Sequence, residues 1–376
     1  MAAPVWSDTK RTDRLRVEMV CPTDITKSYG DLEGVVSASC SVDCGYYTDT
    51  RTSAKVKVIG EGWRRNSMLR LWHEVPEWDW SEPIGTYIVT DEKASRENGA
   101  WAYELTLQSL LYALSVDLLV KPWTRAKGSS ALAAARSILK TCNRAYSDKG
   151  AADHKASKAV VMESGTSYLK QLFTICEETN NRLDVDARGN VTLAKRVSPS
   201  AKTPTLTIDL TDPEGVAQAG TLTRSTDYLD SSSVVAVSYK WTTQKKSGNS
   251  TKSVSHEINA WSRVTANDYR SSGTRGYTVT DFRSLTSMSP QTHARAQALA
   301  DKYLKADNAE LVEWTVDTCY LPVWEGDVVS LVVPDGESRY KGTRKCLVKS
   351  VSIDCEHWTM SLTLKETASG DKGDEA

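Results

Sequence analysis

The sequence contains almost no phenylalanine and has no excess of either charge. Of its 376 residues only 2 are Phe, whereas 12 are Trp and 15 are Tyr. Lys and Arg together number 47 and Asp and Glu 48, which leaves a net charge of −1. Because the neutralisation of phosphates supplies most of the affinity of nucleic-acid-binding proteins, this balance argues against autonomous binding of DNA or RNA.

Long apolar runs are absent as well. No stretch of the sequence approaches the about 18 apolar residues that a membrane-spanning helix needs. Met1 is not followed by the charged and then apolar leader of a secreted protein. We therefore expect no stable membrane insertion, no export by a signal peptide, and synthesis in the cytoplasm.

Motifs of catalysis are missing too. The sequence has no His-Glu-x-x-His, no Gly-x-Ser-x-Gly and no phosphate-binding glycine-rich loop. Residues 164–167 (Ser-Gly-Thr-Ser) resemble a nucleophile turn only superficially and suit a helix cap better. Asp354, Glu356 and His357 cluster at an expected β-turn, where charged residues are usually solvated. We expect no enzyme activity, no catalytic residue and no cofactor, with a hydrolase using Asp354 or His357 as a remote alternative.

The eight cysteines are widely spaced, which argues against a metal site. Only Cys40 and Cys44 lie close together, and a zinc site would need two more ligands that no second Cys or His pair supplies. Cys142 and Cys176 fall on apolar faces of expected helices, where cysteine behaves as a small hydrophobe. We therefore expect reduced structural thiols and no bound metal.

The most regular pattern lies between residues 128 and 196 and predicts two helices followed by a hairpin. Serines at 129 and 130 precede an apolar stripe with helical spacing, formed by Leu132, Ala135, Ile138, Leu139 and Cys142. A polar connector leads to a second helix, for which Ser164, Thr166 and Ser167 are alternative caps. The apolar face of this second helix consists of Leu169, Leu172, Phe173 and Cys176.

The hairpin follows directly. Residues 182–186 and 191–193 alternate with a period of two, which is typical of strands. They flank the tetrapeptide 187–190, which contains Gly189 and predicts a tight turn.

Strand patterns dominate on both sides of this central stretch. Before it, they occur at 15–20, 32–42, 55–59, 68–75, 84–90 and 101–107, separated by turn residues at the spacing of a barrel or sandwich. Residues 105–119 then become apolar at helical spacing. After residue 204, strands are expected at 206–210, 234–241, 273–281, 310–319, 327–333, 345–354 and 358–365, and Pro290 opens a helix.

Two segments are predicted to lie on the surface. Residues 242–255 are rich in Lys, Ser, Thr, Gly and Asn, with Gly248-Asn249 near the middle, and form a long exposed hairpin or a loop. Residues 368–376 are polar and charged, which is typical of a disordered tail.

The Trp and Tyr content favours a protein that makes contacts. Both side chains combine a large apolar area with a polar group, which suits subunit interfaces, although strands also favour them. Glu77-Trp78-Asp79-Trp80 forms an aromatic and acidic loop. We interpret Trp78 and Trp80 as packing or interface residues, with a carbohydrate platform as the alternative.

The central stretch resembles the central domain of bacteriophage tail hub proteins, also called baseplate hub or tail-associated proteins. A helix of the form S-x-L-x-x-A-x-x-I-L precedes S-G-T-S-Y-L-x-x-L-F-x-I-C-E-E-T-N-N-R-L-D-V-D-A-R-G-N-V-T-L. Residues 321–331 (L-P-V-W-E-G-D-V-V-S-L), with 346–353 and 358–364, resemble the closing barrel of that family. There Gly326 can adopt a positive φ and Asp327 can close its own turn by hydrogen bonding.

The resemblance implies an α+β, β-rich fold with two tail-tube-type β-barrels, a helix-helix-hairpin central domain and an inserted subdomain. The implied boundaries are 1–118 for the N-terminal barrel, 119–200 for the central domain, 201–241 and 308–367 for the second barrel, 242–307 for the insertion, and 368–376 for the tail.

It also implies a structural virion protein. Family hubs are homotrimers at the distal end of the tail, where they join the sixfold tube to the tail tip around the DNA channel. The implied partners are a distal tail or tail-tube protein, the tape measure protein, and tail-tip or fibre proteins, with no specific nucleic-acid binding. The chain would be a short form without a C-terminal enzymatic or receptor-binding extension, assembled in the host cytoplasm. A carbohydrate- or receptor-binding tail-tip protein is the alternative.

Residues 368–376 carry no apolar anchor. Truncation after Thr367 should therefore leave the melting temperature unchanged, because no buried area is lost. Differential scanning calorimetry of the full and truncated chains checks this, and a fall of several degrees would contradict it.

Overall fold

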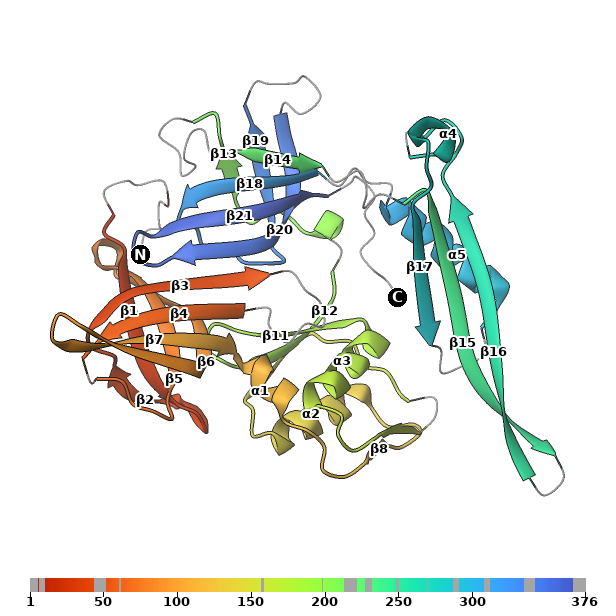
Figure 1. Ribbon diagram of the computed structural model, residues 1–376, viewed down its shortest axis with the longest axis horizontal. Coiled ribbons are helices and arrows are strands. Elements are labelled where there is room, and N and C mark those ends of the chain that lie inside the picture. Colours follow the sequence, from red (N-terminus) through yellow and green to blue (C-terminus); the bar gives the residue numbers. More distant parts are fainter. Residues whose placement is uncertain are drawn as a thin grey trace. The chain divides into compact units, whose positions relative to one another are not determined.

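The chain divides into two compact units (Figure 1). The computed structural model describes residues 6, 11–43, 52–60, 62–156, 159–197, 199–212, 222–226, 232–247, 250–268, 270–286, 291–307, 312–334 and 342–367. The first unit comprises Met1–Leu222, Thr315–Leu364 and Lys372–Ala376, and the second comprises Thr223–Trp314 and Lys365–Asp371. The expected tail at 368–376 and the turn at Gly248-Asn249 lie outside the described residues.

The N-terminal third forms an antiparallel sheet. Its strands are β1 (Arg14–Cys21), β2 (Asp24–Asp31), β3 (Val35–Asp43), β4 (Thr52–Ile59), β5 (Met68–Val75), β6 (Trp80–Glu97) and β7 (Ala100–Ser109), with a 3-10 turn at Pro76–Trp78. They pair in the order β3-β4-β7-β6-β5-β1-β2. In β4 the expected alternation holds, because Val56 and Val58 are buried whereas Lys55 is exposed. The sequence did not predict β2, because all but two of its eight residues are polar or glycine.

The C-terminal strands of the first unit continue the same sheet. They are β13 (Thr207–Asp209), β18 (Val312–Cys319), β19 (Val328–Val333), β20 (Gly342–Asp354) and β21 (Thr359–Glu366). β20 pairs with β3, with Ser352 opposite Ser41, so the two β-rich regions are joined edge to edge. β19 pairs with β20 on one side and with β13 on the other. The described part of the chain is therefore β-rich with few helices, and the closure of either set of strands into a barrel stays a prediction.

The central stretch contains the two predicted helices and the hairpin. Its elements are α1 (Leu110–Val116), β8 (Trp123–Arg125), α2 (Ala131–Thr141), β9 (Tyr146–Lys149), β10 (Val160–Met162), α3 (Tyr168–Thr179), β11 (Asn181–Val185) and β12 (Val191–Lys195). Leu132, Leu139, Leu169 and Leu172 belong to one buried cluster. Helical structure begins at Leu110 and not at residue 105, because residues up to Ser109 pair as β7 and the Ser109 hydroxyl caps α1.

Local hydrogen bonds explain where these helices begin and end. The Ser130 hydroxyl accepts from the backbone N–H of Ala133 at the start of α2. Of the three possible caps of α3, Ser167 is the one used, and its hydroxyl accepts from the backbone N–H of Lys170 at 3.2 Å. α3 ends at Asn180, which has a φ of 52° and tolerates this left-handed conformation.

The second unit contains a separate three-stranded sheet. Its strands are β15 (Val234–Ser247), β16 (Ser250–Arg263) and β17 (Thr280–Thr286), in the order β16-β15-β17. The unit also contains β14 (Thr223–Thr226), α4 (Ser272–Arg275) and α5 (His293–Asp307). One face of the sheet packs on α5 through Val235, Val237, Val264, Ala300 and Leu304.

Two expectations change in this unit. The strand at 234–241 was assigned to the second barrel, but it begins β15, whose partners are β16 and β17. Alternation predicts a strand but not its partner. The strand expected at 273–281 is instead α4 followed by the start of β17, because Ser271 caps α4 and Gly276 ends it at a φ of 80°.

In segment 242–255, for which we expect a hairpin or a loop, residues 242–247 pair with residues 250–255 as antiparallel strands. In the part of the chain that the structure describes, no helix is both long and apolar enough to cross a bilayer.

The choice of Ser167 as the cap of α3 can be tested by substitution. Ser167→Ala should lower the free energy of unfolding by about 1 kcal/mol, because an N-terminal N–H of the helix loses its partner. Ser164→Ala is the matched control, since Ser164 is exposed and is not the cap. Urea denaturation of both variants measures the difference, and equal effects would show that the cap does not stabilise α3.

Candidate functional site

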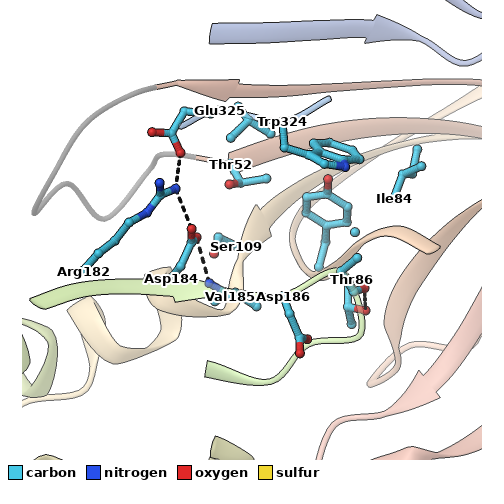
Figure 2. A pocket seen from close by; sticks show the side chains of 14 residues that line it. Thr52, Ile84, Thr86, Ser109, Arg182, Asp184, Val185, Asp186, Trp324 and Glu325 are labelled. Atoms are coloured by element: carbon cyan, nitrogen blue, oxygen red, sulfur yellow. Dashed lines mark hydrogen bonds and ion pairs between the residues drawn. The ribbon is translucent and has the colours of Figure 1, made fainter. Parts of the chain in front are cut away.

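A buried polar site of the first unit lies where the β11–β12 hairpin meets the turn before β19. Arg182 of β11 makes ion pairs with Glu325 and with Asp184, the second at 2.6 Å. The Glu325 side chain is only 2% exposed. Because an unpaired buried carboxylate is strongly unfavourable, the ion pair with Arg182 helps to stabilise buried Glu325. Figure 2 shows Arg182 reaching from the hairpin toward Glu325.

The turn at Gly326 and Asp327 has the positive φ and the hydrogen bond that the sequence predicts, and it also leaves space for Arg182. Gly326 has a φ of 86°. The Asp327 carboxylate accepts from the backbone N–H of Trp324 at 2.9 Å, so this residue closes its own turn. A Cβ at position 326 would collide with the guanidinium of Arg182. The absence of a side chain therefore makes room for the ion pair, which the sequence did not predict.

The hairpin tip is also fixed to β5 and β6. The Arg70 guanidinium donates to the carbonyl oxygens of Arg188 at 2.9 Å and of Ile25 at 2.8 Å. The Thr86 hydroxyl donates to the carbonyl of Ala187 at 2.8 Å. Buried Arg70 is balanced by Glu18 at 3.2 Å. The turn at 187–190 is thus held by long-range contacts as well as by its own sequence.

Glu18 is adapted to this environment. Burial alone would raise the pKa of its carboxyl, but hydrogen bonds from Ser28 and Trp72 and the charge of Arg70 hold the pKa below its usual value. The carboxylate therefore stays ionised beside Arg70. This charge serves the packing of the sheet against the hairpin.

A cavity of about 210 Å³ adjoins this junction (Figure 2). Its lining comes from the N-terminal sheet, the hairpin and the turn before β19, and includes Thr52, Thr86, Ser109, Asp184, Asp186 and Trp324. The Ser109 hydroxyl accepts from the backbone N–H of Leu111, and the Asp186 carboxylate accepts from the backbone N–H groups of Arg188 and Asn190. The Ser109 hydroxyl and the Asp186 carboxylate thus stabilise the local backbone. Among the described residues that line the cavity, no hydroxyl is hydrogen-bonded to a side chain that could act as its base.

The aromatic loop belongs to a packed cluster and not to an open platform. Trp78 and Trp80 are half-buried, and each meets the Trp6 ring nearly at right angles, with centroids 5.5 and 5.4 Å apart. Trp6 also meets the Tyr320 ring, at 6.0 Å. A carbohydrate platform needs an exposed ring face, whereas these rings pack on one another. The geometry therefore supports the interpretation of Trp78 and Trp80 as packing residues over that of a carbohydrate platform.

His73 lies in the same cluster. It is fully buried, and its Nε2 is 2.6 Å from a carboxylate oxygen of Asp13. The centroid of its ring is 4.2 Å from that of Tyr320 and 4.3 Å from that of Trp358. Burial raises the pKa of the Tyr320 hydroxyl, so this group stays protonated. His73 and Tyr320 therefore join β5 to the C-terminal strands inside the first unit.

Asp354, Glu356 and His357 are the one group of three potential metal ligands that the described ranges contain, with ligand atoms within 4.8 Å of one another. His357 is exposed, and its Nδ1 is 2.9 Å from Asp354. The hydrogen bond to Asp354 and its negative charge raise the pKa of His357. Asp354 also accepts from the backbone N–H of Glu356, so its oxygens stabilise the turn between β20 and β21. This is the solvated β-turn that the sequence predicted.

Cys142 and Cys176 lie in the central stretch, at the end of α2 and within α3. Cys176 is fully buried, and burial raises the pKa of its thiol to about 12. Burial also raises the pKa of Cys142 to about 11. Cys176 is a buried member of the central hydrophobic cluster, and partly buried Cys142 packs against that cluster. Cys40 is buried as a free thiol, and Cys44 lies outside the described residues.

The whole-chain architecture is that of phage tail proteins. No protein-family model matches the sequence, and a search of curated proteins finds no relative. Among solved structures, the tail protein from Neisseria meningitidis MC58 is 13% identical, with a TM-score of 0.64 over 96% of this chain and 98% of that chain. The 43 kDa tail protein of prophage MuSo2 from Shewanella oneidensis is 11% identical, with a TM-score of 0.60 over 96% of this chain and 99% of that chain.

A third similar structure comes from a secretion system. The E. coli c3393 protein, a type VI secretion component described as similar to the T4 phage tail proteins gp27 and gp5, is 9% identical. Its TM-score is 0.50 over 91% of this chain and 76% of that chain. Identities this low show a common fold and leave the function of individual residues to their own geometry.

The role of Gly326 can be separated from simple backbone strain. Gly342 also has a positive φ, of 106°, but a Cβ there would meet no atom within 4 Å. Gly342→Ala should therefore cost about 1–2 kcal/mol of unfolding free energy from strain alone. Gly326→Ala should cost at least about 2 kcal/mol more, because it also displaces Arg182 from buried Glu325. Urea denaturation measures both, and equal losses would contradict the ion-pair role.

Proposed function

We propose that this chain, which has the fold of phage tail hub proteins, is a structural virion protein that forms the homotrimeric hub at the distal end of a phage tail. The hub joins the sixfold tail tube to the tail tip and surrounds the channel through which DNA passes. The observation that carries this proposal is the fold match over 96% of the chain to two phage tail proteins. The match covers nearly the full length of both of those proteins, so the hub role is assigned to the chain as a whole.

In this proposal each copy supplies two barrels of the tail-tube type. One is formed by strands within residues 1–118 and the other by strands within 201–226 and 308–367, whereas Val234–Trp241 belongs to the separate sheet with β16 and β17. Three copies then present six barrels to a sixfold tube. The pairing of β20 with β3 supports a rigid side-by-side arrangement of the two β-rich regions, since it joins them by backbone hydrogen bonds.

Exposed apolar side chains support an assembly role. At the end of α1 and just after it, Val116, Leu118 and Val120 are exposed, the last by 88%. In the second unit Trp261 and Phe282 are 64% and 63% exposed. Contiguous exposed apolar residues are typical of interaction surfaces.

The proposed partners are two further copies of this chain, a distal tail or tail-tube protein, the tape measure protein, and tail-tip or fibre proteins. The proposed location is the tail tip of the virion, after assembly in the host cytoplasm. The junction at Arg182 supports a structural role and not an enzymatic one, since its buried charges hold one segment against another. The carbohydrate- or receptor-binding alternative has less support, because Trp78 and Trp80 pack against Trp6.

The trimeric hub can be tested in the assembled particle. Cryo-electron microscopy should find three copies of this chain around an open axial channel, directly below the sixfold tube, because two barrels per copy match six subunits. Native mass spectrometry of the purified chain reports separately whether the ring forms without its neighbours. Six copies with one barrel each facing the channel, or peripheral fibres, would refute the hub assignment.

A further inference from the structure

The three-stranded sheet of the second unit has one face that does not pack on α5. Val235 and Val237 of β15 belong to the core that the sheet shares with α5. Because successive side chains of a strand point to opposite faces, Ala236 lies on the other face, which we call the outer face. The register pairs Ala236 with Trp261 of β16 on one side and with Phe282 of β17 on the other, so the three residues form one row across the outer face.

This row presents two aromatic side chains to the surface. Trp261 is 64% exposed and Phe282 is 63% exposed. Adjacent strands are about 4.8 Å apart, so the Cα atoms of the two residues are about 10 Å apart. Ala236 has only a methyl group, so it fills little of the space between the two larger side chains. Exposed apolar residues are typical of interaction surfaces, and the residues around this row indicate the kind of ligand.

The exposed residues next to the aromatic row are polar. Arg263 and Thr280 lie in the adjoining row on one side, and Asn259 and Ser284 lie in the adjoining row on the other. The centre of a protein interface is a larger apolar area, and a segment that inserts into a membrane needs an apolar face. A sugar ring combines an apolar C–H face with hydroxyl groups. Aromatic rings flanked by hydroxyl and amide groups therefore match a sugar in both respects.

Arg263 adds a positive charge to the outer face. It lies two positions after Trp261 on β16, so the two side chains are on the same face and their Cα atoms are about 7 Å apart. None of the described residues forms an ion pair with exposed Arg263. Arg263 also lines a cavity of about 180 Å³, together with exposed Ser272 and Thr278. A guanidinium binds carboxylate and phosphate groups through paired hydrogen bonds, so this position suits an anionic group of the ligand.

Nucleic acid also combines rings with anions, but it needs more cations than the outer face provides. Its phosphate backbone is held by several lysines and arginines. In the described part of the outer face the other cation is Lys240, whose amino group is 3.9 Å from the carboxylate of Glu257. A single cation without a counter-charge favours a ligand whose negative charges are sparse.

We propose that the outer face binds a saccharide that carries a negatively charged group. Sugar rings stack on Trp261 and Phe282, and Arg263 binds the anion, which is the carboxylate of an acidic sugar or a phosphate ester. This inference goes beyond the hub function and does not depend on it. It concerns the second unit and not the rings of Trp78 and Trp80, which pack on Trp6 in the first unit.

The test is affinity electrophoresis of the full chain in native gels that contain polygalacturonate, phosphomannan or dextran. Polygalacturonate supplies carboxylates, phosphomannan supplies phosphates, and dextran is uncharged. At least one of the two acidic polymers should slow the migration of the wild type, and dextran should slow it less. The acidic polymer with the larger effect identifies the anionic group.

Four variants assign the binding to the outer face. Trp261→Ala and Phe282→Ala should each lower the affinity for the acidic polymer about fivefold to tenfold, since each removes one stacking ring. Phe282→Trp should keep the affinity, because it retains an aromatic face. Arg263→Gln should abolish the preference for the acidic polymer over dextran and leave the affinity for dextran unchanged, whereas a merely structural role of Arg263 would lower both affinities.

Trp101→Ala is the matched control. Trp101 is 48% exposed and lies on β7 of the first unit, so this variant should bind like the wild type. A melting curve shows whether each variant is folded. The melting temperatures should stay close to that of the wild type, because exposed side chains have little buried area to lose.

The proposal is overturned if neither acidic polymer slows the wild type, or if Trp101→Ala weakens binding as much as Trp261→Ala does. A further arm uses a single-stranded oligothymidylate. If it binds more tightly than the acidic polymers and with the same dependence on Trp261, Phe282 and Arg263, the outer face is a nucleic-acid site and the saccharide assignment is wrong. Native mass spectrometry tests the trimer separately, so failure of one proposal leaves the other intact.

Discussion

The burial of Glu325 is the constraint on which the arrangement of the first unit depends. A carboxylate taken out of water costs several kcal/mol unless a cation faces it, and here that cation is Arg182, 143 residues earlier in the chain. The pair forms only when the β11–β12 hairpin lies against the turn before β19 in one register. Gly326 leaves the space for the guanidinium, since a Cβ at this position would collide with the end of the Arg182 side chain.

The same hairpin is bound on its other side to the N-terminal sheet. Arg70 and Thr86 donate to carbonyl oxygens at the hairpin tip, and Glu18 balances the charge of Arg70. The central domain is thereby attached to both β-rich regions of the first unit by buried polar contacts. Such contacts specify geometry more than they add stability, because each has a desolvation cost to offset. That use of polar residues suits a rigid subunit of an assembly.

The abundance of tryptophan and tyrosine has two explanations in the structure. Part of it is internal packing, since the rings of Trp6, Tyr320 and Trp358 contact buried His73. Trp78 and Trp80 pack in turn on Trp6. Another part is exposed, as at Trp261. Composition alone could not separate the two, because an aromatic side chain suits a core and an interface equally well. Whether each aromatic side chain is buried or exposed depends on its position in the folded chain.

The sequence by itself determined the features that depend on neighbouring residues. These include both central helices, the hairpin at 182–193, the alternation in β4, and the turn at Gly326 and Asp327, because caps, periodicity and positive φ are local properties. The tertiary structure alone decided which of three candidate caps starts α3, that the polar segment Asp24–Asp31 is a strand, and that Val234–Trp241 pairs with β16 and β17. It also decided that Arg182 meets Glu325. The pairing of β15 with β17 and the ion pair of Arg182 with Glu325 join segments far apart in the chain, and such pairing leaves no periodic signal in the sequence.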